Sequence, residues 1–472
     1  MGDRVDTTRT LKLVEWIEAI SYNSIPQEVI SMAKLCLLDT LGCAVFGSTR
    51  AWSKMVEAVV RKVSGKGEST IINSHPEVPA PAAALVNGTM VHSFELDDYH
   101  LKALLHPGAP VIPAELALGE VVNATGKQIL EALVIGYEAI TRIGMMVAPE
   151  AGLRGYHPTG INGAFGSAIA SAKLLGFTGD KILSCLGIAG SQAAGLLTFC
   201  EDSSQREGGM VKRFHAGRAS EGGLLAALLV AEGFEGPATI LEGQFGYGKV
   251  YGGKINSECL TKSLGEDYQI LHVAQKPYAC CGLLHSSIDA ILEIKRKRSF
   301  SQKEIAGITV GVPKGVIEQH GDRTPQSIGA AQYSLPFAIA VTLCGDIHDP
   351  DIFNKKTLTD VSVQEMAKKV NLVPDSDLDQ YFPAKGGAKV TLSFRDGSEA
   401  SWKIYDTKGM PENRLSFVEV ATKFKYLCRH ALTPVEIEEA IAVVEELEKL
   451  DSIRKLMKLF RGSSATYVKV SV

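Results

Sequence analysis

The chain has 472 residues, of which 45% are hydrophobic and 22% are charged, within the range of ordinary globular proteins. Its formal net charge of −4 gives no electrostatic reason to expect nucleic acid or an anionic membrane as a partner. No apolar run reaches the roughly 18 residues that span a bilayer, and the N-terminus lacks the apolar core of a secretory signal. Nine cysteines without a CxxC or Cys/His metal spacing indicate reduced thiols. We therefore expect a cytoplasmic protein.

The first half of the chain, from residue 11 to about residue 236, places apolar residues at the three- and four-residue spacing of helices. This spacing predicts helices over residues 26–45, 125–147, 162–175, 180–197 and 216–232. The second of them opens with a capping box from Thr125 to Gln128, which closes the first helical turn. Small residues such as Gly163 and Gly166 let helix backbones approach closely, so we expect a crowded all-α layer.

The pattern changes near residue 269. Residues 305–312 predict a strand, and residues 388–394 and 399–405 flank an Asp-Gly pair at 396–397 that suits a tight hairpin turn. Helical pieces are predicted around residues 334–344 and 362–370. The chain becomes helical again after residue 409, with a capping box at Thr433 and Pro434 at the first helical position.

These patterns predict a mainly α fold, with a large all-helical domain and a smaller α+β domain. The expected boundaries are residues 1–269 for the N-terminal part of the helical domain and 270–409 for the α+β domain. Residues 410–472 are expected to return to the helical domain.

The residues from 91 to 113 hold many ionisable side chains between stretches of apolar, helix-like sequence. Buried ionisable groups must be paired or neutralised, so an ordinary core segment avoids them. A solvated loop could carry these charges, but the apolar neighbours on both sides indicate a polar site set into a helical core. The side chains concerned are His92, His100 and His106, Glu95, Asp97 and Asp98, and Tyr99.

Three further motifs carry candidate groups. His157 stands in a turn framed by glycine and proline, Lys212 follows a double glycine, and His285 ends the segment 276–285. A histidine pKa near neutrality suits proton transfer, so His106 and His157 are acid/base candidates, and Lys212 is a cation for a substrate carboxylate. Each has a structural alternative: a turn histidine bonded to backbone, a solvated lysine at a helix start, and a core histidine at position 285.

We expect neither a metal nor an organic cofactor. His92, His100 and His106 with Asp97 and Asp98 are ligand types that suit zinc or iron, but no pair has the i, i+4 spacing of an H-E-x-x-H site. The sequence has no GxGxxG after a strand and no GxxxxGK[ST] loop, which excludes the common nucleotide sites.

Several motifs, in their order and spacing, resemble those of the MmgE/PrpD family. That family includes 2-methylcitrate dehydratase, cis-aconitate decarboxylase and iminodisuccinate epimerase. The resemblance implies a homodimer, an α+β lid inserted into a helical domain, and a metal-free site in the cleft between the two domains. The motifs are His92-Ser93-Phe94-Glu95-Leu96-Asp97-Asp98-Tyr99-His100, Leu105-His106-Pro107, the Gly-Gly-Met-Val-Lys-Arg run at 208–213, and Tyr278-Ala279-Cys280-Cys281-Gly282-Leu283.

The resemblance also implies roles for single residues. His106 and His157 match the two histidines of the family, and Lys212 matches the lysine of the glycine-led motif. Glu95 and Tyr99 fall where the decarboxylases of animal type have aspartate and threonine. The motifs at 95–100 and 278–283 are closer to those of the fungal itaconate-forming decarboxylases, which favours a decarboxylase.

One position departs from the family pattern. Phe337 stands where the family usually has a tyrosine. The phenol expected there is therefore missing, unless Tyr333 takes its place.

The reactions of this family share a chemical demand, because negative charge builds up on a carboxylate beside the bond that is made or broken. We expect His106 to move the proton with His157 as its partner, and Lys212 to anchor a carboxylate. Glu95 and Asp97 are expected to orient His106. The remaining expected substrate contacts are Tyr99, His285 and Tyr333.

The favoured reaction is decarboxylation of cis-aconitate, a small carboxylate, to itaconate. Dehydration of 2-methylcitrate and an iminodisuccinate-type epimerisation stay open, and a non-catalytic binding protein on the same fold is the alternative of another class. Lid closure over the substrate is expected, because a dry site strengthens electrostatic interactions.

Overall fold

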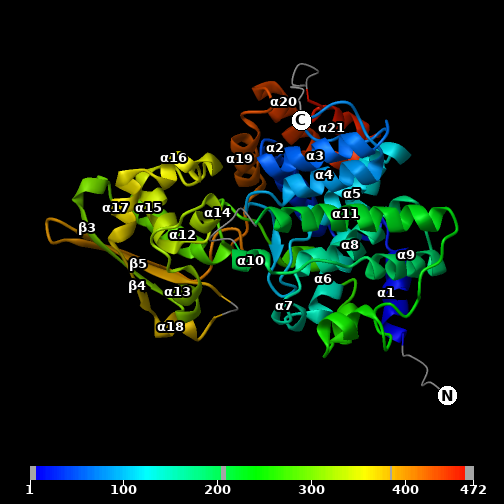
Figure 1. Cartoon of the computed structure of the whole chain (residues 1–472), viewed down its shortest axis with the longest axis horizontal. Helices are drawn as coiled ribbons and strands as arrows, with labels where there is room; N and C mark the ends of the chain where they lie inside the picture. Colours follow the sequence, from blue (N-terminus) through cyan, green and yellow to red (C-terminus); the bar gives the residue numbers. More distant parts are fainter. Residues whose placement is uncertain (1–6, 203–208, 383–384, 463–472) are drawn as a thin grey trace.

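The computed structural model describes residues 7–202, 209–382 and 385–462. Figure 1 shows a larger body made of helices beside a smaller body in which helices cover a sheet. The prediction of a mainly α fold with a smaller α+β part is confirmed. The N-terminal helices of the larger body are α1 (Thr8–Ala19), α2 (Gln27–Ser48), α3 (Ala51–Val63), α4 (Ala80–Val91), α5 (Gly108–Val122), α6 (Gly126–Val147), α7 (Glu150–Leu153), α8 (Pro158–Leu174), α9 (Gly179–Ser191), α10 (Phe199–Asp202) and α11 (Met210–Ala231).

The helix ends follow local signals where such signals exist. Thr125 caps α6 as predicted, because its Oγ1 accepts the Gln128 N–H at 3.3 Å while Gln128 Oε1 accepts the Thr125 N–H at 2.9 Å. Helix α9 ends earlier than predicted, since the chain soon turns through Gly195, whose φ of 140° favours glycine. Helix α11 begins earlier than predicted, which places Lys212 in its first turn.

Helix α2 corrects one expectation from the sequence. It is 22 residues long and apolar enough, by length and composition, to cross a membrane, although no such run was expected. In the structure 89% of its apolar window is buried inside the protein, where α2 contacts α4 and α19 (Phe417–Cys428). Helix α2 is therefore a core helix.

Helix α11 approaches its neighbours closely (Figure 1). A Cβ atom on Gly217 would lie 2.3 Å from the carbonyl oxygen of Leu85 in α4. A Cβ atom on Gly223 would lie 2.4 Å from the carbonyl oxygen of Ala164 in α8. Only glycine permits these distances, so the two glycines let α11 pack closely against α4 and α8.

Replacing Gly217 with alanine is expected to lower the free energy of unfolding by about 1–3 kcal/mol, because a backbone oxygen blocks the added methyl group. The apparent melting temperature of the variant measures the effect. Gly65→Ala is the matched control, since no described atom lies within 4 Å of a Cβ added there. Equal melting temperatures for the two variants would contradict the close packing.

The smaller body is built on a four-stranded sheet with the order β4-β3-β5-β6. Strand β3 (Ile305–Val312) pairs in parallel with β4 (Val370–Pro374) and antiparallel with β5 (Ala388–Phe394), which forms a hairpin with β6 (Glu399–Ile404). Gly397 has a φ of 83° in the hairpin turn, as the Asp-Gly pair predicts. The helices of this body are α12 (His285–Lys297), α13 (Lys314–His320), α14 (Ile328–Gln332), α15 (Leu335–Cys344), α16 (Lys355–Leu358), α17 (Val361–Lys368) and α18 (Ser376–Asp379).

The chain then returns to the larger body as α19, α20 (Pro434–Glu445) and α21 (Arg454–Lys458), drawn in orange and red beside α2 in Figure 1. The two crossings between the bodies lie side by side, because the Gln275 N–H donates to the carbonyl oxygen of Gly409 at 2.9 Å. Next to them β1 (Tyr99–His100) pairs with β2 (Val273–Ala274). The polar stretch that follows α4 therefore lies where the two bodies meet.

Candidate active site

The segment 92–98, which joins α4 to β1, is held by side chains that are distant in sequence. Gln332 Nε2 donates to the carbonyl oxygen of Phe94 at 3.0 Å, and Lys423 Nζ donates to that of Leu96 at 2.7 Å. Both contacts are buried. The α+β body and the C-terminal helices thus jointly fix this segment, and its acidic side chains have defined positions.

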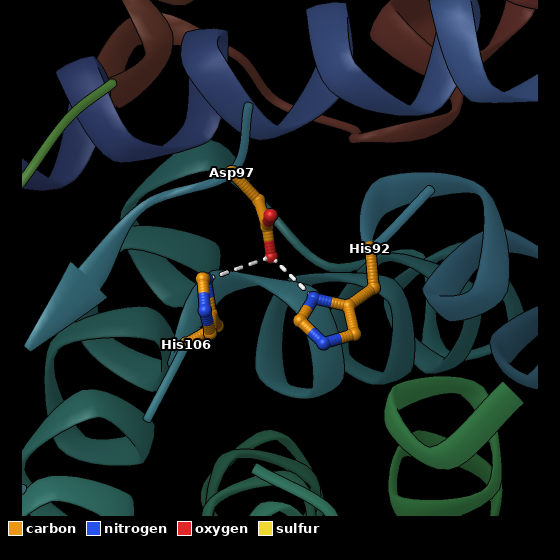
Figure 2. Close-up of side chains that lie close together, drawn as sticks. All are labelled: His92, Asp97 and His106. Atoms are coloured by element: carbon orange, nitrogen blue, oxygen red, sulfur yellow. Dashed lines mark hydrogen bonds and ion pairs between the residues drawn. The ribbon is translucent and has the colours of Figure 1, made fainter. Parts of the chain in front are cut away.

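Asp97 lies between two histidines (Figure 2). Its Oδ2 is 2.6 Å from His92 Nδ1 and 3.2 Å from His106 Nδ1. Burial alone would raise the pKa of Asp97, but His106 and His92 outweigh it and hold that pKa well below its usual value. Burial also lowers the pKa of His92 to about 3, so His92 is neutral and donates from Nδ1. Nδ1 is the ring nitrogen of His106 that lies near this carboxylate, so its Nε2 is the nitrogen left for another partner.

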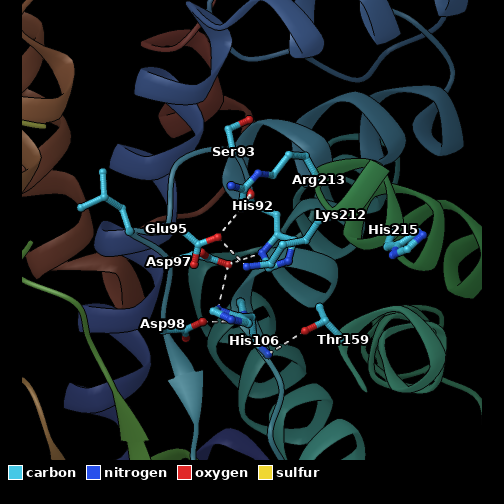
Figure 3. A network of polar contacts seen from close by, with 12 residues as sticks. His92, Ser93, Glu95, Asp97, Asp98, His106, Thr159, Lys212, Arg213 and His215 are labelled. Atoms are coloured by element: carbon cyan, nitrogen blue, oxygen red, sulfur yellow. Dashed lines mark hydrogen bonds and ion pairs between the residues drawn. The ribbon is translucent and has the colours of Figure 1, made fainter. Parts of the chain in front are cut away.

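Glu95 is surrounded by three cations. Its Oε1 is 2.5 Å from Lys212 Nζ and 2.6 Å from Arg213 Nη1, and its Oε2 is 3.2 Å from Lys276 Nζ. Figure 3 shows Lys212 and Arg213 reaching Glu95 from the start of α11. Burial opposes ionisation of Glu95, yet the three cations hold its pKa well below the usual value. One carboxylate shared by three cations leaves excess positive charge for an anionic ligand.

The two lysines of this cluster differ in their electrostatics. Burial is the largest influence on Lys212 and lowers its pKa; Glu95 opposes this, while Arg213 and Lys276 add to it. Burial also acts on Lys276, but Glu95 and Asp97 outweigh it and raise its pKa to about 12. Lys276 is therefore a fixed positive charge at neutral pH.

Lys212, Lys276 and His106 line one cavity of about 220 Å³ at the junction of the two bodies. From the helical body it is lined by Glu95, Tyr99, Leu101, His106 and Lys212. The crossings and the α+β body contribute Lys276, Cys281, Gly282, Leu283, Tyr333, Lys385, Gly386, Tyr405, Asp406, Thr407, Met410 and Glu412. A cavity with cations and a histidine on its walls can bind a small carboxylate beside a proton donor.

The structure brings most of the expected site residues together. Glu95, Tyr99, His106, Lys212 and Tyr333 all line the cavity, and Asp97 lies directly behind His106. The phenol oxygen of Tyr99 lies 3.1 Å from Met410 Sδ. The glycine-led motif is described only from residue 209 onward, so Gly208 lies outside the described residues.

Two expected residues, His157 and His285, do not belong to the described lining of the cavity. His157 Nδ1 lies 3.1 Å from His215 Nδ1, and its ring stacks on that of His92 with 5.7 Å between centroids. Burial holds the pKa of His157 well below its usual value. His285 Nε2 donates to the carbonyl oxygen of Cys280 at 3.2 Å, a contact that its place on the buried side of α12 favours.

The structure also shows where the phenol expected from the family pattern lies. Phe337 is buried in α15 and its ring packs near that of Phe353. Tyr333 places its phenol oxygen 3.3 Å from Lys212 Nζ at the cavity. A phenol is therefore present beside Lys212, but it comes from Tyr333.

Sequence reasoning did not assign Lys276 or Arg213 to the site. Lys276 begins the motif at 276–285 and Arg213 follows Lys212, so both stood in motifs that were singled out. No spacing rule connects either residue with Glu95, because the contacts span 181 and 118 positions of the chain. Only the fold shows that they share one carboxylate.

One group in the described part of the chain could hold a metal ion. The nitrogen and oxygen ligand atoms of His92, Asp97 and His106 lie within 4.8 Å of one another, and zinc accepts these ligand types. In the structure Asp97 Oδ2 stands between the two Nδ1 atoms, so a metal would replace the protons there. The expected absence of a metal stays a prediction.

Asp98, which follows Asp97, has a protonation state that changes with pH. Tyr137 Oη at 2.7 Å and the Gly108 N–H at 3.0 Å donate to its two oxygens, and burial raises its pKa to about 7. In the unfolded chain the pKa has its usual value of 3.8. The stability that protonated Asp98 contributes is therefore present below about pH 4 and is lost as the pH rises to about 7.

The Asp98→Asn variant is expected to remove this loss of stability with rising pH. Between about pH 4 and pH 7 the melting temperature of the variant should rise relative to that of the unaltered protein, because asparagine stays neutral. Thermal unfolding followed across this range measures the difference. A difference that is independent of pH would contradict a raised pKa at Asp98.

The cavity combines a histidine–carboxylate pair with clustered cations at the junction of a helical and an α+β body, which are features typical of an enzyme active site. The chain belongs to the MmgE/PrpD family: residues 11–259 match the MmgE/PrpD N-terminal domain and residues 278–449 match the C-terminal domain. The resemblance found in the motifs is therefore confirmed.

Curated relatives cover nearly the whole chain. A protein of Aspergillus terreus named cis-aconitate decarboxylase is 28% identical over 95% of this chain and 95% of its own length. Proteins of the same name from Mus musculus and Homo sapiens are each 27% identical over 95% of this chain, and the alignments cover 92% and 93% of their lengths. The chain is similar to a fungal and to two animal decarboxylases.

Proposed function

We propose that this chain decarboxylates cis-aconitate to itaconate. The chain is a lyase of the MmgE/PrpD family, and relatives along its whole length carry the name of this activity. The observation that carries the proposal is the placement of Lys212 and Lys276 around Glu95 in the same cavity as His106. A tricarboxylate has three anionic groups, which suit a cavity with several cations.

The reaction needs charge stabilisation and one proton. Loss of carbon dioxide from the saturated arm of cis-aconitate leaves an allylic anion, whose charge spreads onto the carboxylate at the other end of the double bond. Lys212 and Lys276 stabilise that charge, because both lysines are buried and burial strengthens electrostatic interactions. Addition of a proton to the carbon beside that carboxylate gives itaconate.

His106 is the proposed proton donor. It lines the cavity, and Asp97 holds its Nδ1 side, so Nε2 faces the substrate. The phenol of Tyr333 beside Lys212, and that of Tyr99, are proposed hydrogen-bond donors to the substrate carboxylates. His157 is neutral because its pKa is lowered, so it is proposed to position the histidine cluster without adding charge.

The α+β body is proposed to act as the lid of this site, with the helical parts before residue 270 and after residue 409 forming the base. Support comes from the cavity walls, which include Tyr405 and Asp406 of the smaller body and His106 of the larger one. Closure of the lid would exclude water from the anionic intermediate. The homodimer, the cytoplasmic location, and the absence of nucleic-acid and membrane partners remain predictions.

Product analysis tests the proposed reaction. The purified protein is incubated separately with cis-aconitate, 2-methylcitrate and iminodisuccinate in heavy water, and products are followed by proton NMR. We expect itaconate in the first incubation, with one deuterium on the methylene carbon that receives the proton. Turnover of only 2-methylcitrate would replace the proposal by a dehydratase, and solvent deuterium without net conversion would indicate an epimerase. No change in any incubation would favour a binding protein.

A chelator arm of the same assay tests metal independence. The protein is treated with EDTA, dialysed, and assayed with cis-aconitate. Unchanged turnover is expected if His92, Asp97 and His106 act through protons alone. Loss of turnover that zinc restores would assign a metal to this trio.

A further inference from the structure

A thiol–imidazole pair stands on the wall of the same cavity. Cys281 Sγ lies 3.8 Å from His320 Nε2 at the end of α13. His320 Nδ1 lies 2.9 Å from the carbonyl oxygen of Tyr333, which can only accept a hydrogen bond, so Nδ1 carries the proton. His320 Nε2 therefore presents its lone pair to the thiol.

The pair is neutral at rest. Burial raises the pKa of Cys281, although Lys276 and Lys212 pull it the other way. Burial lowers the pKa of His320. Cys281 is thus a thiol beside an unprotonated base, an arrangement that forms the nucleophilic thiolate only when the proton moves to His320.

Cys281 differs from its sequence neighbour. Cys280 is fully buried, whereas Cys281 is partly exposed and lines the cavity. Both are thiols and form no disulfide with each other. Of these two cysteines, Cys281 is the one that can meet a ligand held by the lysines.

We propose that Cys281 is a modification site for anionic electrophiles, which Lys212 and Lys276 bring to its sulfur. The chemical class is a small carboxylate with an electrophilic carbon, such as an α,β-unsaturated acid or a halocarboxylate. Selection comes from local concentration: the cations hold the carboxylate in the cavity, and a held reactant reacts faster than a free one.

For an unsaturated acid, the sulfur adds to the terminal alkene carbon. The S–C bond forms as the thiol proton passes to His320, and the π electron pair moves to the carbon beside the carboxylate. His320 then returns the proton to that carbon, so no atom leaves and no oxidant is needed. This part rests on the proposed function, because itaconate is such an acid, and it predicts slow inactivation by accumulated product.

Alkylation of the full-length protein tests the site without reference to turnover. The protein is treated with iodoacetate or with uncharged iodoacetamide, and peptide mass spectrometry gives the rate at each cysteine. Cys259 and Cys344 are internal controls, since they are also partly exposed. The iodoacetate-to-iodoacetamide rate ratio is expected to be at least about 10-fold higher at Cys281 than at the controls.

Two variants separate the contribution of the cations from that of His320. Lys276→Met should lower the ratio at Cys281, because the anion loses a cation. His320→Gln should slow both reagents at Cys281 and leave the ratio unchanged, because glutamine cannot accept the thiol proton. Equal ratios at Cys281 and the controls in the unaltered protein would overturn the proposal, whether or not the variants fold.

A third incubation, with itaconate, tests the product. We expect the peptide of Cys281 to gain the mass of one whole itaconate. Its absence would overturn addition of the product. Selective alkylation without turnover of cis-aconitate would support the modification site and contradict the proposed function. Turnover of cis-aconitate with equal alkylation ratios would support the proposed function and contradict the modification site.

Discussion

The His106→Gln variant is expected to lose about 10²–10⁴-fold in kcat for cis-aconitate, because glutamine cannot supply a proton to carbon. His106 lines the cavity, and Asp97 Oδ2 lies 3.2 Å from its Nδ1. Glutamine is close to histidine in size, and Asp97 keeps its hydrogen bond with His92, so the fold should persist. Itaconate formation at saturating substrate measures kcat, and circular dichroism checks the fold.

A histidine–aspartate pair on the surface provides the control. His272 Nε2 lies 2.6 Å from Asp267 Oδ1, with the histidine side chain 35% exposed. His272→Gln removes a similar pair that is not part of the cavity lining and should leave kcat unchanged. If His106→Gln turned over substrate as fast as His272→Gln, His106 would not be the proton donor.

The Lys212→Met variant is expected to lose about 10²–10³-fold in kcat/KM, because one cation that stabilises the developing charge is removed. The buried Glu95 keeps Arg213 and Lys276 as partners, at 2.6 and 3.2 Å, so it is not left unpaired. Steady-state kinetics with cis-aconitate measure the loss. Lys102→Met, which removes an exposed lysine, is the control.

Glu95→Gln gives a second readout of the same lysine. Burial lowers the pKa of Lys212 and Glu95 opposes that effect, so removing the carboxylate should lower the pKa further. The alkaline limb of the kcat/KM profile is then expected to move to lower pH. The assigned role of Lys212 would be contradicted if Glu95→Gln left the alkaline limb at the same pH and Lys212→Met remained active.

Local signals in the sequence predicted a large part of the fold. The capping box at Thr125 and the Asp-Gly turn with Gly397 determine where α6 and the β5–β6 hairpin lie, because their hydrogen bonds join residues close in sequence. Strand β4 was not predicted, since its parallel pairing with β3 bridges about sixty positions. The early start of α11 was also missed, although it places Lys212 on a helix.

By itself, the sequence determined that residues 91–113 are polar and enclosed by apolar helices, and that histidine and lysine motifs of one family are present. Only the tertiary structure decided which of these groups share a cavity. Glu95 contacts Lys212 and Lys276, which are 117 and 181 positions away in the sequence. His285 lies outside the described lining of the cavity, and Tyr333 lies beside Lys212. The physical reason is that the protonation state of a site residue depends on the charges that lie near it in space. Burial strengthens each of these interactions, because little water is left to screen them.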